Sequence, residues 1–380
     1  MLELFLLSFV TAAVIAHVTL RSGFLHARVT GDIAARGSHK VHVNPVCRVG
    51  GVSILIGWLV GLIASRYALH ISTSAVALWI ACLLPVFLTG LAEDLTKQIS
   101  PRVRLLGSSV TAGLACLLMG AAVSRVDVGV LDLLLAVPGV AFVFTLFAVS
   151  GVAHAVNIID GLNGLASAVC LMALLALGYV AFQVNDTEIL LMAGLGAAAL
   201  LGFYIWNYPS GRIFLGDGGA YFLGAYIAIV SALLVNRNAA VSAWFPLLLV
   251  LYPVWETLFS AYRRRILRGA PATSADKLHM HTLIYKRVKQ PDAQTNGWRT
   301  RRNSDASVSM MMLAGCNVLP AVLWWSDGRF LAVSILVYVV AYLVIYRALL
   351  RFRLQSSQTV VGLFGRRLSQ SASETTPKKV

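Results

Sequence analysis

The sequence predicts an all-α polytopic membrane protein with about eleven transmembrane helices. Of its 380 residues, 58% are hydrophobic and only 12% are charged, and the mean hydropathy is +0.78. A soluble domain cannot bury that much apolar surface. The apolar residues gather in runs of about 20, the length that a helix needs to cross the hydrocarbon core of a bilayer. The ten-residue alternating pattern of a membrane β-barrel does not appear, so we predict that the spans are helices.

The predicted helices follow one another along most of the chain. They cover residues 2–20, 50–66, 72–91, 105–123, 133–152, 164–183, 189–206, 219–235, 240–261, 307–325 and 330–349. The chain begins with Met-Leu-Glu and has no positively charged n-region, so we interpret the first helix as an anchor and not as a cleaved signal peptide. Residues 1–350 then form one transmembrane domain. Residues 351–380 form a basic tail, rich in Ser and Thr, that we expect to be disordered.

The basic residues are distributed unevenly between alternate loops. All but four of the 31 Lys and Arg residues fall on one set of loops and on the tail. The exceptions are Arg66, Arg125, Arg237 and Arg329. The positive-inside rule makes the basic side cytoplasmic, which places the amino terminus in the periplasm and the carboxyl terminus in the cytoplasm. Basic loops that face anionic lipid headgroups also explain the net charge of +15, so we expect no nucleic-acid partner.

Five clusters of unusual polar residues fall on the predicted cytoplasmic side, and two of them contain groups of glycines. One cluster places His42 and Arg48 ahead of a glycine pair, which suits phosphate binding, although a basic helix flank has the same composition. The other runs from Phe214 to Tyr221 and sets Asp217 among three glycines. Glycines let the backbone approach a phosphate, and the carboxylate can hold a hard cation such as Mg²⁺. The alternative for Asp217 is the capping of the next helix.

Two more clusters combine carboxylates with amides or lysine. Glu93 and Asp94 are adjacent, and Lys97 follows them on the next helical turn. Such a pair can accept a proton or help to hold a metal ion, and the alternative is a salt bridge at a helix end. After the fifth predicted helix, polar residues recur every three positions and would line one side of a helical turn. These residues are Asn157, Asp160 and Asn163. Their oxygens can ligate a metal or recognise a base or sugar, unless the segment is an ordinary turn.

The fifth cluster lies in the long basic loop between the ninth and tenth predicted helices. It contains His279, His281 and Arg287, which are suitable partners for a diphosphate. A zinc site would need a further ligand of matching kind, which this loop lacks. We expect Glu256, near the inner end of the ninth helix, to pair with the basic run 263–265 and to be structural. Together the five clusters predict Mg²⁺-assisted chemistry on a diphosphate at the boundary between water and lipid.

The order of the motifs E-D-L-T-K, N-I-I-D-G-L-N-G, F-L-G-D-G-G and H-M-H-T-L-I-Y-K-R resembles the polyprenyl-phosphate N-acetylhexosamine-1-phosphate transferases, glycosyltransferase family 4. This family includes the translocase that makes the first lipid intermediate of peptidoglycan and the enzymes that initiate O-antigen, enterobacterial common antigen and teichoic acid. The resemblance extends over roughly residues 1–350. Eleven helices and an H-x-H loop are closer to the O-antigen type than to the ten-helix peptidoglycan type.

The resemblance implies a reaction in the bacterial inner membrane. A UDP-N-acetylhexosamine, most often UDP-GlcNAc, gives its sugar 1-phosphate to undecaprenyl phosphate and releases UMP. The lipid-linked product starts a cell-envelope polysaccharide, for example the O antigen of lipopolysaccharide. The resemblance also implies dependence on Mg²⁺, for which Mn²⁺ can substitute. A second copy of the chain, in a homodimer, is a further candidate partner.

The resemblance assigns roles to individual residues. It makes Asp217 a Mg²⁺ ligand and Asn157 a second ligand or a nucleotide contact, and it places the acidic pair on Glu93 and Asp94. The family usually has two aspartates there, so Asp94 is the stronger candidate, and a further histidine often stands where this chain has Thr282. We expect Asp94 or Asp160 to accept a proton from the lipid phosphate. The candidate substrate-binding residues are Lys97, Asn163, His279, His281, Arg287, His42 and Arg48.

Other functions share some of these features. A lipid-linked sugar flippase would have the same helices and basic loops, but transporters usually place polar groups near mid-membrane. A peptidoglycan-type phospho-MurNAc-pentapeptide transferase is the nearest enzymatic alternative. A CDP-alcohol phosphotransferase would need further aspartates after Asp160-Gly161, and this chain has none there. Within the preferred reaction, a covalent aspartyl-phosphate route is the alternative to direct displacement.

Overall fold

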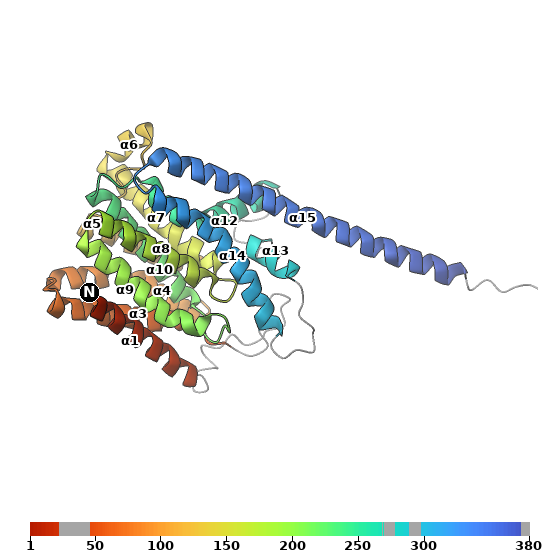
Figure 1. The fold of residues 1–380 in the computed structure, drawn as a ribbon, viewed down its shortest axis with the longest axis horizontal. Helices are drawn as coiled ribbons and strands as arrows, with labels where there is room; N and C mark the ends of the chain where they lie inside the picture. The colour runs from red at the N-terminus through yellow and green to blue at the C-terminus, as the bar shows by residue number, and fades with distance from the viewer. Residues whose placement is uncertain (23–45, 268, 270–277, 289–297, 374–380) are drawn as a thin grey trace, which may run out of the picture. The chain divides into compact units, whose positions relative to one another are not determined.

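The computed structural model describes residues 1–22, 46–267, 269, 278–288 and 298–373, which are mostly helical (Figure 1). The chain divides into two units, residues 1–335 and 336–380. The helices are α1 (Leu2–Arg21), α3 (Gly50–Ala68), α4 (Thr73–Thr96), α5 (Pro101–Met119), α6 (Gly129–Leu135), α7 (Pro138–Ile159), α8 (Leu165–Gln183), α9 (Thr187–Asn207), α10 (Gly216–Arg237), α11 (Trp244–Leu249), α12 (Leu251–Tyr262), the π-helix η1 (Arg263–Leu267), α13 (Met280–Arg287), α14 (Trp298–Leu323) and α15 (Gly328–Ser373). The last helix begins in the first unit, continues into the second, and includes residues 351–373 of the segment for which we expect a disordered tail.

Ten helices in the described ranges are long and apolar enough to cross a membrane. They are α1, α3, α4, α5, α7, α8, α9, α10, Thr300–Leu323 of α14 and Gly328–Arg351 of α15. Each overlaps one of the predicted spans. The difference from the predicted number arises at the ninth predicted helix, 240–261, because the structure has two short helices there, α11 and α12, that meet at Val250.

Pro253 explains this interruption of the ninth predicted helix. Proline has no N–H, so the carbonyl of Leu249 loses the partner that it would have four residues later, and the proline ring crowds that carbonyl. Val250 accordingly departs from helical geometry, with φ −101° and ψ 13°. Pro253 itself lies in the first turn of α12, where a missing N–H breaks no bond within the helix.

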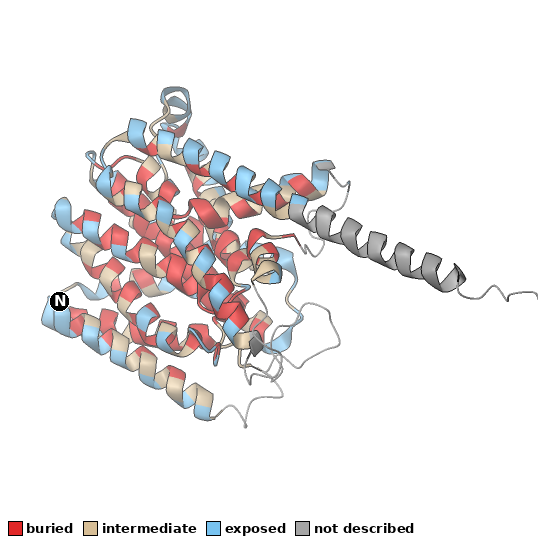
Figure 2. Cartoon of the chain, turned by 45° about the vertical axis from the view of Figure 1, so that its right-hand side comes forward, coloured by how far each residue is buried: buried red, intermediate tan, exposed pale blue. Residues whose placement is uncertain are grey.

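Helix α10 forms the centre of the first unit. It packs against α3, α4, α7 and α8, and every residue from Gly216 to Ile227 is buried. In Figure 2 the buried residues concentrate in the middle of the bundle, whereas the outer helix at the amino terminus alternates between buried and exposed positions. A helix that is apolar on all sides is stable only when it is enclosed. This position fixes the start of α10, and with it Asp217, relative to the surrounding helices.

Glycines let three helices approach one another at the start of α10. A Cβ added at Gly51 of α3 would lie 2.4 Å from the backbone N of Gly219, and one at Gly90 of α4 would lie 2.7 Å from Gly218 Cα. The backbones are therefore in direct contact, and no side chain fits between them. The glycines at the starts of α3 and α10 are predicted to admit a phosphate. In the structure they also let helices α3 and α4 contact α10.

We predict that Gly51→Ala destabilises the protein by about 1–3 kcal/mol, because the added methyl group has no room and the helices must separate. The matched control is Gly151→Ala in α7, where an added Cβ meets nothing within 4 Å. That change should be neutral or stabilising by about 0.5–1 kcal/mol, since alanine favours helix more than glycine. Thermal unfolding of the detergent-solubilised proteins measures both effects, and equal midpoints for the two variants would contradict this account of the packing.

Candidate active site

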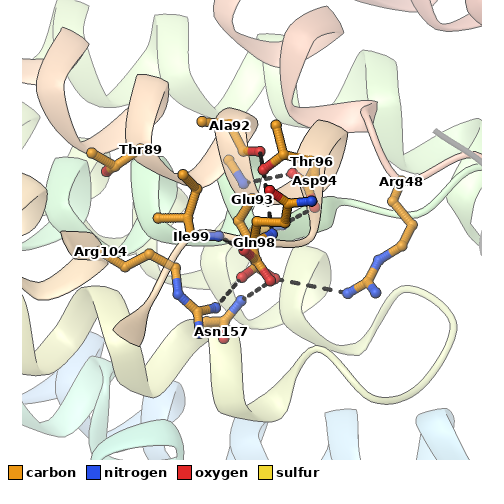
Figure 3. Close-up of polar contacts among 12 residues, drawn as sticks. Arg48, Thr89, Ala92, Glu93, Asp94, Thr96, Gln98, Ile99, Arg104 and Asn157 are labelled. Carbon is orange, nitrogen blue, oxygen red and sulfur yellow. Dashed lines mark hydrogen bonds and ion pairs between the residues drawn. The ribbon is translucent and has the colours of Figure 1, made fainter. Parts of the chain in front are cut away.

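Asp217, in the first turn of α10, is the residue on which the site converges. Arg104 from α5 donates from Nη1 to Asp217 Oδ2 at 2.5 Å. Asn157 from α7 donates from Nδ2 to Oδ1 at 3.0 Å, and Arg48 Nη2 lies 3.7 Å from the same oxygen. Figure 3 shows Arg48, Arg104 and Asn157 approaching from three different elements. The start of a helix also favours a negative charge, so this nearly buried carboxylate is compensated from several directions.

Asp94, at the end of α4, accepts hydrogen bonds from the backbone at the start of α10, beside Asp217. Its Oδ1 accepts the N–H of Asp217 and its Oδ2 accepts the N–H of Gly218, both at 2.9 Å. The first N–H groups of a helix have no partner within the helix, and α10 has no side-chain cap of its own. Asp94 therefore caps α10 from another helix. With 3% of its surface exposed and both oxygens engaged, Asp94 holds Asp217 in place.

Backbone hydrogen bonds bring Arg48 to the site. Phe214 N donates to Cys47 O at 2.9 Å, and Gly50 N donates to Phe214 O at 3.0 Å. The segments before α3 and before α10 thus run side by side and are joined by the parallel bridge between Cys47 and Ile213. Arg48, predicted to bind substrate, lies where this paired segment passes Asp217. His42, predicted for the same role, lies outside the described residues.

Asp160 follows the last residue of α7, one turn after Asn157. Part of the residue reaches the surface, and no side chain in the described ranges hydrogen bonds to its carboxylate. Desolvation raises the pKa of Asp160 to about 7, while the positive charge of Arg48 acts in the opposite direction. Because both oxygens of Asp94 already accept backbone N–H groups, Asp160 is the better placed of the two carboxylates to exchange a proton near neutral pH.

Three other predicted residues have structural contacts. Glu93 Oε2 accepts the N–H of Ile99 at 2.7 Å and so closes the loop between α4 and α5. Lys97 ends α4 in a left-handed conformation and is exposed. Asn163 is buried, donates from Nδ2 to Pro209 O at 3.1 Å and donates from its backbone N–H to Asn303 Oδ1 at 2.7 Å. Because α7 ends at Ile159, Asn163 does not continue the helical turn of Asn157 as expected; its role in substrate binding stays a prediction.

The H-x-H motif reaches the turn that contains Asp160. The rings of His279 and His281 stack with centroids 5.4 Å apart and planes 4° from parallel. A Cβ added at Gly161 would lie 2.6 Å from His281 Nε2, so His281 packs directly on the residue after Asp160. Arg287 is the last residue of the helix that follows, α13. Tertiary structure therefore brings this distant motif next to the α7–α8 turn.

Arg104 is the site residue that the sequence reasoning missed. We counted it only among the basic residues that mark the cytoplasmic side. The available signal was its position inside the first turn of an apolar helix, where a cation needs a partner. The structure supplies Asp217 as that partner, and the guanidinium also lies 5.9 Å from the ring centre of Tyr221, one turn further along α10. Its Nε is buried and has no hydrogen-bond partner among the described residues.

Comparison with known proteins identifies the family. Residues 76–235, from α4 to α10, match the model of glycosyl transferase family 4. This stretch of the chain is a glycosyl transferase family 4 domain. This confirms the resemblance that the motifs suggested. The matched region includes Asp94, Arg104, Asn157, Asp160 and Asp217.

Two similar proteins are named for the same activity. A probable undecaprenyl-phosphate N-acetylglucosaminyl 1-phosphate transferase of Bacillus subtilis (strain 168) is 29% identical over 73% of this chain and 75% of its own length. An undecaprenyl-phosphate α-N-acetylglucosaminyl 1-phosphate transferase of Thermotoga maritima is 28% identical over 69% of this chain and 76% of its own. A phospho-N-acetylmuramoyl-pentapeptide-transferase of Streptococcus uberis is 39% identical, but over 30% of this chain and 32% of its own length. The apolar helices and these membrane-transferase relatives support a multi-pass membrane protein.

The donor atoms of the site fit a Mg²⁺ ion that substrate phosphates help to bind. In the described ranges, no three His, Cys, Asp or Glu side chains come together as a complete metal cage. Mg²⁺ does not require such a cage, because it commonly binds one or two carboxylates together with phosphate oxygens and water. Asp217 offers a carboxylate, and the amide of Asn157, whose Nδ2 donates to that carboxylate in the structure, would turn its oxygen toward the ion. The two arginines at Asp217 would then be available to the added phosphates.

If a nucleotide sugar is the substrate, as proposed below, we predict that Arg104→Lys raises its KM by roughly tenfold, because lysine keeps the charge but loses the planar pair of donors. Arg102→Lys is the matched control, since Arg102 lies two residues earlier in α5 and is exposed. Steady-state kinetics on both variants measure the effect. An unchanged KM in Arg104→Lys would remove Arg104 from the substrate site.

Proposed function

We propose that this protein transfers N-acetylhexosamine 1-phosphate from a UDP-sugar to undecaprenyl phosphate, with UDP-GlcNAc as the first candidate donor. The observation that carries the proposal is the meeting of Arg48, Arg104 and Asn157 at the carboxylate of Asp217. Such a site suits a diphosphate, whose charge needs cations and donors on several sides. The names of the relatives from Bacillus subtilis and Thermotoga maritima support the acceptor and the sugar.

The reaction is a direct displacement at phosphorus. An oxygen of the lipid phosphate attacks the β-phosphorus of the nucleotide sugar, and the bond from that phosphorus to the bridging oxygen breaks. UMP leaves with the bridging oxygen, and the lipid keeps the sugar on a new diphosphate. Arg48 and Arg104 offset the negative charge of the reacting phosphates, and Asp160 takes the proton of the lipid phosphate. His279, His281 and Arg287 contact the diphosphate or the sugar.

Asp217 and Asn157 would hold the Mg²⁺ ion, or Mn²⁺ in its place. When bound, the ion supplies neutralisation of the diphosphate charge and of the leaving UMP. The contacts of Asp94 favour a positioning role over a role as proton acceptor, since both of its oxygens already accept backbone N–H groups. The active site would face the cytoplasm of a bacterial inner membrane, and the product would start a cell-envelope polysaccharide of the O-antigen type.

The pKa of Asp160, raised by burial to about 7, predicts the pH dependence. Since the ionised form accepts the proton, kcat/KM should rise with pH up to about 7 and level off above it. The same shift affects stability: the folded-state pKa lies above the ordinary value of 3.8, so the folded chain binds more protons than the unfolded chain between the two values. The contribution of Asp160 to stability therefore falls as pH rises through this window.

This prediction is checked by pH–rate profiles of the wild type and of Asp160→Asn. The variant should lose most of its activity, and its residual rate should lack the acid limb. The same limb in the residual activity of the variant would assign it to another group.

A UMP-release assay tests the proposed function. Purified protein in detergent is incubated with undecaprenyl phosphate, Mg²⁺ and a panel of UDP-N-acetylhexosamines. Release with one donor that is lost with EDTA and in Asp217→Asn would support the transferase and name its sugar. Absence of release with every donor, from protein shown to be folded, would contradict the proposal and leave the transporter function to be tested by accessibility from both sides. Phosphosugar-labelled enzyme formed without the lipid acceptor would replace direct displacement by the covalent route.

A further inference from the structure

Glu256, in α12, is a carboxylate with no exposed surface. A buried carboxylate is tolerated only when other groups hydrogen bond to it or neutralise it. Its Oε1 lies 2.9 Å from His279 Nδ1. The backbone N–H of Met280 donates to both of its oxygens at 3.3 Å. These contacts link it to the H-x-H motif, and its pairing with the basic run 263–265 stays a prediction.

These contacts make Glu256 a cap for α13. Met280 is the first residue of that helix, and its N–H has no partner within the helix. His279 occupies the cap position, but its side chain forms no cap hydrogen bond and is turned to Glu256. Asp94 caps α10 in the same way, from a different helix. Helices α10 and α13 therefore each begin on a buried carboxylate that a neighbouring helix supplies.

The contact between Glu256 and His279 also fixes the tautomer and the orientation of the His279 ring. When Nδ1–H donates to the carboxylate, the imidazole is held in one tautomer and its Nε2 is left for another partner. The ring of His279 stacks on that of His281, and His281 Nε2 packs on Gly161 beside Asp160. A continuous series of contacts thus runs from Glu256 through both histidines to the turn of the candidate active site.

We propose that Glu256 is a positioning residue for the sugar-phosphate transfer, which holds His279 and the start of α13 so that the H-x-H motif faces the diphosphate. The inference rests on the proposed function. It gives Glu256 a role in the reaction that acts through its contacts with His279 and with the backbone of Met280.

The test is a double-mutant cycle on the full chain in lipid nanodiscs. Glu256→Gln, His279→Gln and the double variant are compared with wild type for kcat and KM in the UMP-release assay. Hydrogen exchange of residues 278–288 is measured on the same proteins without substrate. Glu188→Gln is the matched control, because Glu188 forms an ion pair of 2.7 Å with Arg237 at the opposite end of the helices and makes the same chemical change away from the site.

We expect each single variant to lose roughly tenfold or more in kcat/KM, as is typical when the partner of a functional histidine is removed. The double variant should be no worse than His279→Gln alone. Exchange at 278–288 should be faster in Glu256→Gln and unchanged in Glu188→Gln. Independent, multiplicative losses in the double variant, or unchanged exchange at 278–288, would overturn the proposal. If wild-type protein releases no UMP, the proposed function fails, and the exchange measurement still decides whether Glu256 holds α13.

Discussion

Asp217→Asn is expected to lower UMP release by roughly 10²-fold or more while the protein remains folded. The side chains are nearly the same size, but the variant loses the negative charge that forms ion pairs with Arg104 and Arg48. It also loses the only carboxylate proposed to hold Mg²⁺. Initial rates over a range of Mg²⁺ concentrations, together with thermal unfolding, separate loss of activity from loss of fold.

The control for this prediction is Asp305→Asn, which makes the same change at an exposed residue of α14. It should keep wild-type activity. Near-normal turnover by folded Asp217→Asn would refute both the metal role of Asp217 and its place at the centre of the site.

Asp94→Asn should reduce stability and activity together. An asparagine can accept only one of the two N–H groups at the start of α10, and its own NH₂ group would face the other. Leaving a buried N–H without a partner costs about 1–3 kcal/mol, and the displaced start of α10 would misplace Asp217. Thermal unfolding and UMP release are measured on the same preparations.

Glu93→Gln is the informative comparison, because Glu93 accepts a single N–H, that of Ile99, and glutamine can still accept it. We expect a much smaller loss in this neighbour of Asp94. If Asp94→Asn abolished turnover without any loss of stability, Asp94 would act as a proton acceptor and its capping contact would be incidental.

Most of the membrane architecture was predictable, because it depends on local properties of the chain. The predicted spans overlap the helices of the structure, since hydropathy over about 20 residues is enough to define them. The ninth span was predicted as one helix because its apolar run is continuous. Only Pro253, which removes the partner of the Leu249 carbonyl, signalled the interruption at Val250. The predicted orientation of the termini stays a prediction.

The motifs were predictable from the sequence, but the contacts of each carboxylate were not. The sequence by itself determined the apolar spans, the gathering of polar clusters on alternate loops and the resemblance to the family that the comparison confirmed. These features depend only on the type and spacing of residues that are near one another in the sequence. At that level Asp94 and Asp160 were equivalent candidates for the proton acceptor, and the resemblance alone assigned Asp217 to the metal.

Tertiary structure alone decided how these residues differ. Asp94 became a cap because α4 crosses the start of α10 at glycines, and Asp217 met Arg104 because α5 lies beside that crossing. Glu256 contacts His279, 23 residues later in the sequence, because α12 lies beside the start of α13. Partners of buried polar groups are set by which helices cross and where, and such contacts between distant segments leave no periodic signal in the sequence.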